Sequence, residues 1–329
     1  MMSEFSLQLS LKPNPNSIEY TSPVFLIGSC FTEHICERLQ QHKFQVCSNP
    51  HGILFNPLSV AECLERYISG APYVKEDLFY LNELWNSWSH HTRFSHVDAS
   101  SALSNMNQAL EVAYRSIRKA NFLIITLGSS FQYYLKESQT PVANNHRAPS
   151  QWFEKKLLDI DTIVNRLQLS LENIRRVNPE VQFIFTISPV RHIRDGVVAN
   201  NRSKARLLEA VHQLCESNKD ILYFPAYELV IDILRDYRFY DIDFVHPNYM
   251  ATQYVWEQFV HVYMTDKTQG IMEQVKEIQT AKNHRTRFPN TQAHQDFLKT
   301  YTLKVQKLKE AYPFLDLQEE YNYFSTELQ

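Results

Sequence analysis

The sequence predicts a doubly wound, flavodoxin-like α/β/α fold with a mostly parallel five-stranded sheet and a C-terminal helical extension. Short apolar runs rich in β-branched and aromatic residues recur along the chain and end in turn residues. Such runs are typical of strands buried on both faces of a parallel sheet. Helical patterns separate the runs, and this alternation of strand and helix indicates the α/β class. The chain of 329 residues is long enough for one large domain with an appendage.

The expected elements follow in chain order. Five apolar runs should form the sheet, at residues 23–28, 44–47, 121–128, 181–187 and 221–224. Helical patterns cover residues 31–42, 58–69, 104–119, 161–177, 203–217 and 248–264. Right-handed crossovers bring the carboxyl ends of parallel strands to one edge of the sheet. Residues that directly follow the strands are therefore expected to meet at that edge, where ligands bind in such folds.

Other stretches depart from this alternation of strands and helices. Residues 70–100 are rich in Trp, His, Ser and Tyr and are expected to form an inserted excursion, such as a hairpin. Residues 135–158 are expected to be irregular. Beyond residue 267 the chain becomes polar and helical, with two helices separated near 288–290. We therefore expect an α/β domain at 1–266 and a helical extension at 267–329, which either packs on the main domain or forms a homo-oligomer interface.

The composition excludes several classes of protein. The formal net charge is −3, from 33 basic and 36 acidic residues, so nucleic acid is not an expected partner. No apolar run approaches the length of a membrane span, and the first residues lack the basic and apolar segments of a signal peptide. The five cysteines form no C-x-x-C pair, which argues against a disulfide framework or a zinc ribbon. We expect a cytoplasmic protein with no membrane partner and no cofactor.

Ser29 is the first candidate for chemistry. It lies in the run Gly28-Ser29-Cys30-Phe31, between the first strand and the first helix. A serine there would present its hydroxyl at the carboxyl edge of the sheet, near helical N–H groups that can stabilise an oxyanion. Serine is also a favoured helix cap, and glycine is common in such turns, so this run alone favours a structural role.

A second signal lies far downstream, where Asp243 and His246 are separated by two residues. Within a single turn this spacing can bring a carboxylate to an imidazole, orient the ring and stabilise its protonated form. Pro247 occupies a position where helices commonly start, which places His246 at a loop–helix junction. Together with a serine after the first strand, the pair predicts a triad of Ser29, His246 and Asp243.

This combination resembles the SGNH or GDSL hydrolase superfamily. The run Gly28-Ser29-Cys30-Phe31 is similar to the motif that names the GSCFA family, with Thr32 where that family usually has alanine. Further stretches resemble the same family, at residues 52–59, 93–96, 126–128, 188–196 and 237–240. The resemblance extends over most of the chain, and it implies the fold and the triad but no substrate.

The resemblance also implies an oxyanion hole with three donors. Two would be the backbone N–H groups of Ser29 and Gly52, and the third an asparagine side chain in a G-x-N-D block after the third strand. Here Gly128 is followed by serines and no asparagine. Loss of one donor costs about 2–4 kcal/mol of transition-state stabilisation. Asn56 and Asn145 are the candidate replacements, and each is also suited to a plain structural role.

Other polar residues are candidates for substrate binding. His91 and His96 belong to a histidine-rich cluster with His90 and Asp98. The cluster fits a substrate-pocket wall or an exposed hairpin; a metal site is a further alternative, but the spacing matches no specific metal pattern.

Arg191 and His192 follow the fourth strand at the same edge. An arginine there is suited to hold an anionic group, and a salt-bridge cluster that orients loops is an equal alternative. Cys30 adjoins Ser29, and a thiol near a helix N-terminus can be reactive, so a cysteine nucleophile is a minor alternative.

We therefore expect a serine esterase or acyl hydrolase, or an acyltransferase, that acts through an acyl-enzyme. Ser29 would attack, His246 would act as base and then as acid, and Asp243 would orient His246. A small-molecule or carbohydrate ester is the expected substrate, the carbohydrate by analogy with the superfamily. The alternatives are a catalytically idle binding module, which the absent asparagine favours, and an assembly protein that works through its helical tail.

Overall fold

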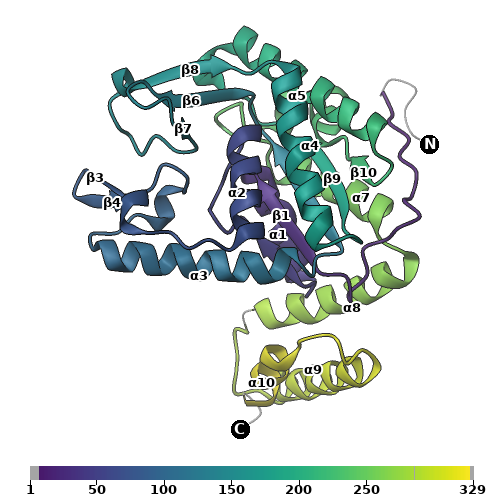
Figure 1. Ribbon diagram of the computed structural model, residues 1–329. Helices are drawn as coiled ribbons and strands as arrows, with labels where there is room; N and C mark the ends of the chain where they lie inside the picture. The colour runs from purple at the N-terminus through teal and green to yellow at the C-terminus, as the bar shows by residue number, and fades with distance from the viewer. Residues whose placement is uncertain (1–6, 285, 327–329) are drawn as a thin grey trace. The chain divides into compact units, whose positions relative to one another are not determined.

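The computed structural model describes residues 7–284 and 286–326 (Figure 1). The chain divides into two compact units. Among the described residues, the first unit contains 7–10, 23–36 and 47–258, and the second contains 11–22, 37–46 and 259–326. Every candidate site residue lies in the first unit.

A five-stranded sheet forms the centre of the first unit, with strand order β10-β9-β5-β1-β2. Its strands are β1 (Val24–Gly28), β2 (Val46–Ser48), β5 (Phe122–Leu127), β9 (Gln182–Ile187) and β10 (Ile221–Tyr223). The pairs β1–β5, β5–β9 and β9–β10 are all parallel. Strands β1 and β5 are buried along their whole length, as their unbroken apolar runs require. The predicted doubly wound α/β fold is confirmed.

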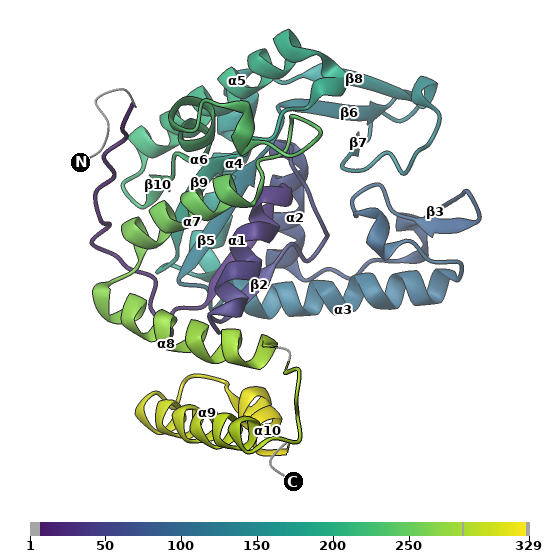
Figure 2. The ribbon, with the colours of Figure 1, turned by 180° about the vertical axis from the view of Figure 1, so that it is seen from behind.

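Helices cover both faces of this sheet. Figure 1 shows α2 (Pro57–Ser69), α4 (Ile160–Val177) and α5 (Val197–Ser217) on one face. Figure 2 shows α1 (Cys30–Gln41) and α7 (Tyr249–Tyr263) on the other. The core joins strand residues such as Phe25, Ile125 and Phe185 to helix residues such as Leu64 and Leu167. Burial of these apolar faces stabilises the three-layer arrangement.

Local signals fix the helix ends. Asn56 precedes α2, and its side-chain oxygen accepts a hydrogen bond from the Ser59 N–H, while Pro57 occupies the first turn. Gly70 ends α2 with φ of 64°, a left-handed conformation that glycine adopts at little cost. Asp98 and Asp159 cap α3 (Ala99–Ile117) and α4 in the same way as Asn56 caps α2.

Two smaller sheets complete the first unit. The excursion at 70–100 contains the antiparallel hairpin of β3 (Phe79–Leu81) and β4 (Leu84–Asn86). A three-stranded sheet is formed by β6 (Phe131–Leu135), β7 (Pro141–Val142) and β8 (Phe153–Leu157). The expectation of an irregular stretch at 135–158 was therefore wrong where β7 and β8 lie. These strands are short and only half-buried, so they lack the apolar runs that reveal the central strands.

Beyond residue 265, the described part of the second unit forms three helices, α8 (Asp266–Asn283), α9 (Gln292–Ala311) and α10 (Gln318–Thr326), where two were expected. The carboxylate of Glu320 on α10 is buried and forms ion pairs with Lys43 at 2.6 Å and with Lys282 at 3.7 Å. Tyr20 stacks on Phe44 with ring centroids 4.2 Å apart. These contacts join segments that are distant in sequence within this unit.

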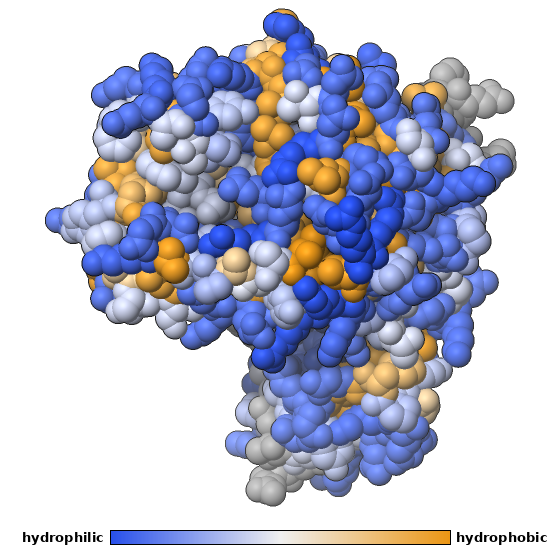
Figure 3. All heavy atoms as spheres, in the orientation of Figure 1, coloured by the Kyte–Doolittle hydropathy of each residue, from blue (hydrophilic) through white to orange (hydrophobic). Residues whose placement is uncertain are grey.

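No helix in the described part of the chain is both long enough and apolar enough to span a membrane. The face of the protein drawn in Figure 3 is mostly hydrophilic, with scattered apolar patches.

Candidate active site

Ser29 lies at the junction between β1 and α1, at the carboxyl edge of the sheet. Its side chain is buried, and its Oγ makes no hydrogen bond with any described residue. Its backbone N–H donates to the Thr126 carbonyl at 3.1 Å. The preceding Gly28 has φ of 143°, and a Cβ there would lie 2.2 Å from the same carbonyl oxygen. Glycine is therefore required next to Ser29 for steric reasons.

Asp243 and His246 form a hydrogen-bonded pair in the loop before α7. His246 Nδ1 lies 2.6 Å from Asp243 Oδ2, and Asp243 Oδ1 accepts from the backbone N–H groups of Val245 and His246. The backbone N–H of His246, then its side chain, lowers the pKa of Asp243 to about 2. The carboxylate is therefore ionised at any working pH, as an orienting acid must be. Phe244 between them has φ of 57°, a conformation that is costly for a large side chain and is found at functional sites.

The pair is half-exposed, with 51% of the His246 side chain and 46% of the Asp243 side chain accessible. No hydrogen bond joins His246 to Ser29 Oγ in the described structure. Hydrogen bonds between nucleophile and base are often long before substrate binds. The structure thus joins Asp243 to His246 and places Ser29 at the carboxyl end of β1, without a hydrogen bond between Ser29 and the pair.

His192 follows β9 and lies close enough to His246 for the two rings to interact electrostatically. Its ring packs against Phe55, with centroids 5.1 Å apart, and a side chain at Gly128 would meet His192 Nε2 at 3.4 Å. Burial, then the nearby Lys204, lowers the pKa of His192 to about 4, and His246 contributes in the same direction. Arg191 donates to the Tyr240 hydroxyl at 3.0 Å, which attaches the Asp243–His246 loop to the end of β9. The structure therefore brings Arg191 and His192 to the predicted site.

Gly52 follows β2 with φ of 84°, and a Cβ there would lie 2.2 Å from the Cβ of His91. Its N–H donates to the Asn49 carbonyl at 2.7 Å. The two expected backbone donors, Ser29 N–H and Gly52 N–H, are thus both engaged with protein carbonyls. Either must exchange its partner before it can bind an oxyanion.

The two tentative asparagines have other surroundings. Both side-chain amide atoms of Asn56 are engaged with Ser59, at 2.9 Å each, as the cap of α2. Asn145 lies in a loop in which its carbonyl accepts from the Ala148 N–H. His96 exchanges backbone hydrogen bonds with Trp85 beside the hairpin, and its Nδ1 accepts from the Asp98 N–H. Neither contact connects His96 to Ser29.

Sequence reasoning missed Asn49. Its Oδ1 accepts from the Gly28 N–H at 2.8 Å, its side chain is buried, and its Nδ2 has no hydrogen-bond partner among the described residues. Its φ of 43° lies in the left-handed region, which asparagine tolerates better than most residues. The only signal in the sequence was an asparagine before proline at the end of a strand, which reads as an ordinary turn.

Lys204 on α5 was also missed. It is buried, and its Nζ donates to the carbonyls of Gly128 at 2.6 Å and Ser188 at 2.5 Å. Burial lowers the pKa of Lys204 to about 7. The adjacent Ser203 binds the Ser130 N–H at 2.7 Å, so α5 holds the turn after β5 that contains no asparagine. A lysine inside an amphipathic helix pattern gives no sign of such a role.

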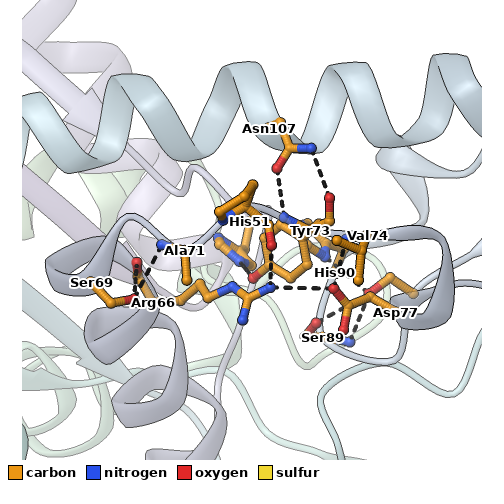
Figure 4. A network of polar contacts seen from close by, with 12 residues as sticks. His51, Arg66, Ser69, Ala71, Tyr73, Val74, Asp77, Ser89, His90 and Asn107 are labelled. Atoms are coloured by element: carbon orange, nitrogen blue, oxygen red, sulfur yellow. Dashed lines mark hydrogen bonds and ion pairs between the residues drawn. The ribbon is translucent and has the colours of Figure 1, made fainter.

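A buried histidine network supports the loop that carries Gly52 (Figure 4). His51 is fully buried, and its Nδ1 lies 2.8 Å from the Tyr67 hydroxyl, while its Nε2 bonds to the Tyr73 hydroxyl. His90 stacks on His51 with centroids 4.1 Å apart. Asn107 of α3 binds both backbone groups of Tyr73, at 2.7 and 3.0 Å. This network fixes the residue directly before Gly52.

The network predicts destabilisation by acid. Burial, then Arg66 and Arg93, lowers the pKa of His51 to about 3, against about 6.5 in an unfolded chain. His51 therefore stabilises the fold fully above pH ~6.5 and loses this contribution as the pH falls toward 3. We expect urea unfolding to give a free energy lower by about 2–3 kcal/mol at pH ~4.5 than at pH ~7 from His51 alone. The variant His51→Asn should lose that part of the pH dependence, and His212→Asn, at an exposed site, should keep it. Equal pH dependence in His51→Asn and wild type would contradict this assignment.

The alternatives raised for metal and thiol chemistry gain no support. Within the described residues, no group of three or more His, Cys, Asp or Glu side chains is placed to hold a metal ion. Burial, then Glu33, raises the pKa of the Cys30 thiol. A neutral thiol is a poor nucleophile, so the raised pKa argues against Cys30 as the attacking group.

Comparison with known proteins gives two family matches. The GSCFA family profile matches residues 23–259, and the profile of the GSCFA domain protein, C-terminal domain, matches residues 275–329. The search of curated proteins gave no match.

The solved structures that match this chain include three esterases. A carbohydrate esterase family 3 from Talaromyces cellulolyticus is 10% identical with a TM-score of 0.35, over 78% of this chain and 99% of that one. A Clostridium thermocellum family 3 carbohydrate esterase is 10% identical with a TM-score of 0.33, over 76% and 98%. An acetyl xylan esterase from the rumen bacterium Butyrivibrio proteoclasticus is 11% identical with a TM-score of 0.37, over 78% and 66%. At such distances the similarity says nothing of substrate or activity.

Proposed function

Because the chain belongs to the GSCFA family, we propose that it is a serine hydrolase that cleaves an ester, or transfers its acyl group, through an acyl-enzyme on Ser29. The observation that carries the proposal is the Asp243–His246 pair, bonded at 2.6 Å at the edge of the sheet where Ser29 is placed. A carboxylate, an imidazole and an unbonded serine hydroxyl at one sheet edge are the groups that acyl transfer requires.

The hydrogen bond to Asp243 fixes the chemistry of His246. Because Nδ1 faces a carboxylate, Nδ1 carries the hydrogen and Nε2 is free to accept a proton. In the first half-reaction Ser29 Oγ attacks the ester carbon, and its proton passes to His246 Nε2. The proton then passes to the leaving alkoxide oxygen as the C–O bond breaks. Water or an acceptor alcohol attacks the acyl-enzyme in the second half, with His246 again as base and then as acid.

Apolar side chains border the Asp243–His246 pair and bear on the kind of substrate. Exposed aromatic and aliphatic residues on this loop and at the start of α7 include Tyr237, Ile242, Phe244, Tyr249 and Met250. Aromatic side chains at a site edge are suited to stack on a sugar ring or to cover an acyl group. We propose an acylated carbohydrate as the substrate class on this basis, with the acyl group left open.

A catalytically idle binding module is the second candidate. It is favoured by the engagement of both expected backbone donors, Ser29 N–H and Gly52 N–H, with protein carbonyls. A protein of this kind would keep the Asp243–His246 contact but would form no covalent intermediate.

Trapping the acyl-enzyme separates these candidates. Mixing the protein with p-nitrophenyl acetate and quenching in acid should give a burst of p-nitrophenol and an acetyl group on Ser29, located by peptide mass spectrometry. Cys30→Ala should behave as wild type. An acetyl group on Cys30 would move the nucleophile to the thiol, and the absence of both burst and adduct would favour the binding module.

A further inference from the structure

Acyl transfer through Ser29 needs hydrogen-bond donors aimed at the developing oxyanion. The two backbone donors expected there are engaged, Ser29 N–H with Thr126 and Gly52 N–H with Asn49. The turn after β5 offers no asparagine, and both amide atoms of Asn56 are bonded to Ser59. A donor that is buried, unpaired and next to the nucleophile would resolve this shortage.

Asn49 has such a donor. Its Oδ1 accepts from the N–H of Gly28, the residue before Ser29, at 2.8 Å. Because Gly28 N–H can only donate, the side-chain atom that faces it must be the oxygen, so the other atom is the NH₂ group. That Nδ2 is buried and has no partner among the described residues. A buried NH₂ group without a partner is costly to keep, so its presence beside the nucleophile calls for an explanation.

The position of this amide is rigidly set. The Asn49 N–H donates to the Leu26 carbonyl at 2.9 Å, and its own carbonyl accepts from Gly52 N–H and from Arg93. With its Oδ1 also engaged, every hydrogen-bonding group of Asn49 except Nδ2 is held. Ser29 Oγ is likewise buried and unbonded. Ser29 and Asn49, which directly follow β1 and β2, thus present one free hydroxyl and one free donor.

We propose that Asn49 is a catalytic residue whose Nδ2 donates to the oxyanion formed when Ser29 attacks the ester. The proposal rests on the function proposed above and assigns the donor that the turn at Gly128 lacks. The fixed side chain costs no reorganisation during the reaction, which is the property that makes such donors effective. The Gly28 N–H bond keeps the amide in register with the nucleophile.

Two substitutions distinguish the donor role of Nδ2 from the anchor, which is the hydrogen bond between Gly28 N–H and Asn49 Oδ1. Asn49→Asp keeps an oxygen for the Gly28 N–H and a residue that tolerates positive φ, but removes the NH₂ group. Asn49→Gly also tolerates the backbone and removes both. If Nδ2 is the donor, both variants should lower kcat for p-nitrophenyl acetate about 10²- to 10³-fold with little change in KM. If only the anchor matters, Asn49→Asp should keep wild-type kcat and Asn49→Gly should lose it, and that result would overturn the proposal.

Asn178→Asp is the matched control. Asn178 is also buried, and its Nδ2 donates to the Ile117 and Ala120 carbonyls, before the amino end of β5 and away from Ser29. The folded fraction of the Asn178→Asp variant should keep wild-type kcat. Wild-type protein that forms no acyl-enzyme at all would instead refute the proposed function, so the two failures are distinguishable.

A measurement on wild-type protein covers the case in which Asn49→Asp does not fold. Side-chain amide signals in nitrogen-edited NMR spectra can be compared before and after Ser29 reacts with a fluorophosphonate, whose phosphonyl oxygen occupies the oxyanion position. The pair of signals that is missing from Asn49→Gly should shift on phosphonylation. An unchanged Asn49 pair in fully labelled protein would overturn the proposal.

Discussion

Ser29→Ala should lower kcat/KM for p-nitrophenyl acetate by about 10³- to 10⁶-fold. The substitution removes the Oγ that forms the acyl-enzyme and changes little else, because that atom makes no hydrogen bond with any described residue. Its fold should therefore be retained, and the thermal midpoint should lie close to that of wild type. Initial rates and circular dichroism melts of both proteins check the two statements.

Ser170→Ala is a suitable control for Ser29→Ala. Ser170 is equally buried, but it lies on α4, where its hydroxyl binds Glu65 and the Arg166 carbonyl. This variant should keep its activity and lose some stability. Ester hydrolysis that survives in Ser29→Ala, at the wild-type rate, would show that another group carries the reaction.

Asp243→Asn should lower kcat by roughly 10²- to 10⁴-fold. The carboxylate accepts the Nδ1 hydrogen of His246 and two backbone N–H groups, whereas an amide can hold the ring in the wrong tautomer. The lower part of the range is favoured because nearly half of the Asp243 side chain is exposed, and solvent screens its charge.

Asp241→Asn provides the comparison within the same loop. Asp241 is exposed, and its side chain accepts a hydrogen bond from the Ile242 N–H, a role that asparagine can fill. Its kinetics should match those of wild type. Equal losses in both variants would mean that the loop is sensitive to any substitution, and would remove Asp243 from its assigned role.

Much of the fold could be predicted because its signals are local. The buried strands β1, β5 and β9 are unbroken apolar runs, and the caps at Asn56 and Asp159 are visible as residue types. The strands β6 and β8 were missed because their half-buried pattern lacks such runs. Their pairing depends on contacts between Phe131 and Leu157 that are distant in sequence.

The candidate site also contains residues that the sequence predicts and residues that it does not. Asp243 and His246 are close in sequence, so one turn can join them, and the spacing D-x-x-H predicts their contact. Asn49 and Lys204 become visible only when β2 and α5 are placed beside Ser29 and Gly128. Neither residue type is unusual in its local sequence. A donor left unpaired and a lysine held by two carbonyls are properties of the folded chain alone.

Labelling with a fluorophosphonate tests the central claim most directly. Wild-type protein and His246→Ala would be incubated with the reagent, and the modified peptide would be identified by mass spectrometry. An activated serine predicts a label on Ser29 in wild type and a much slower reaction in His246→Ala. No label on Ser29, or labelling at the same rate in both proteins, would contradict a Ser29 nucleophile that is activated by the Asp243–His246 pair.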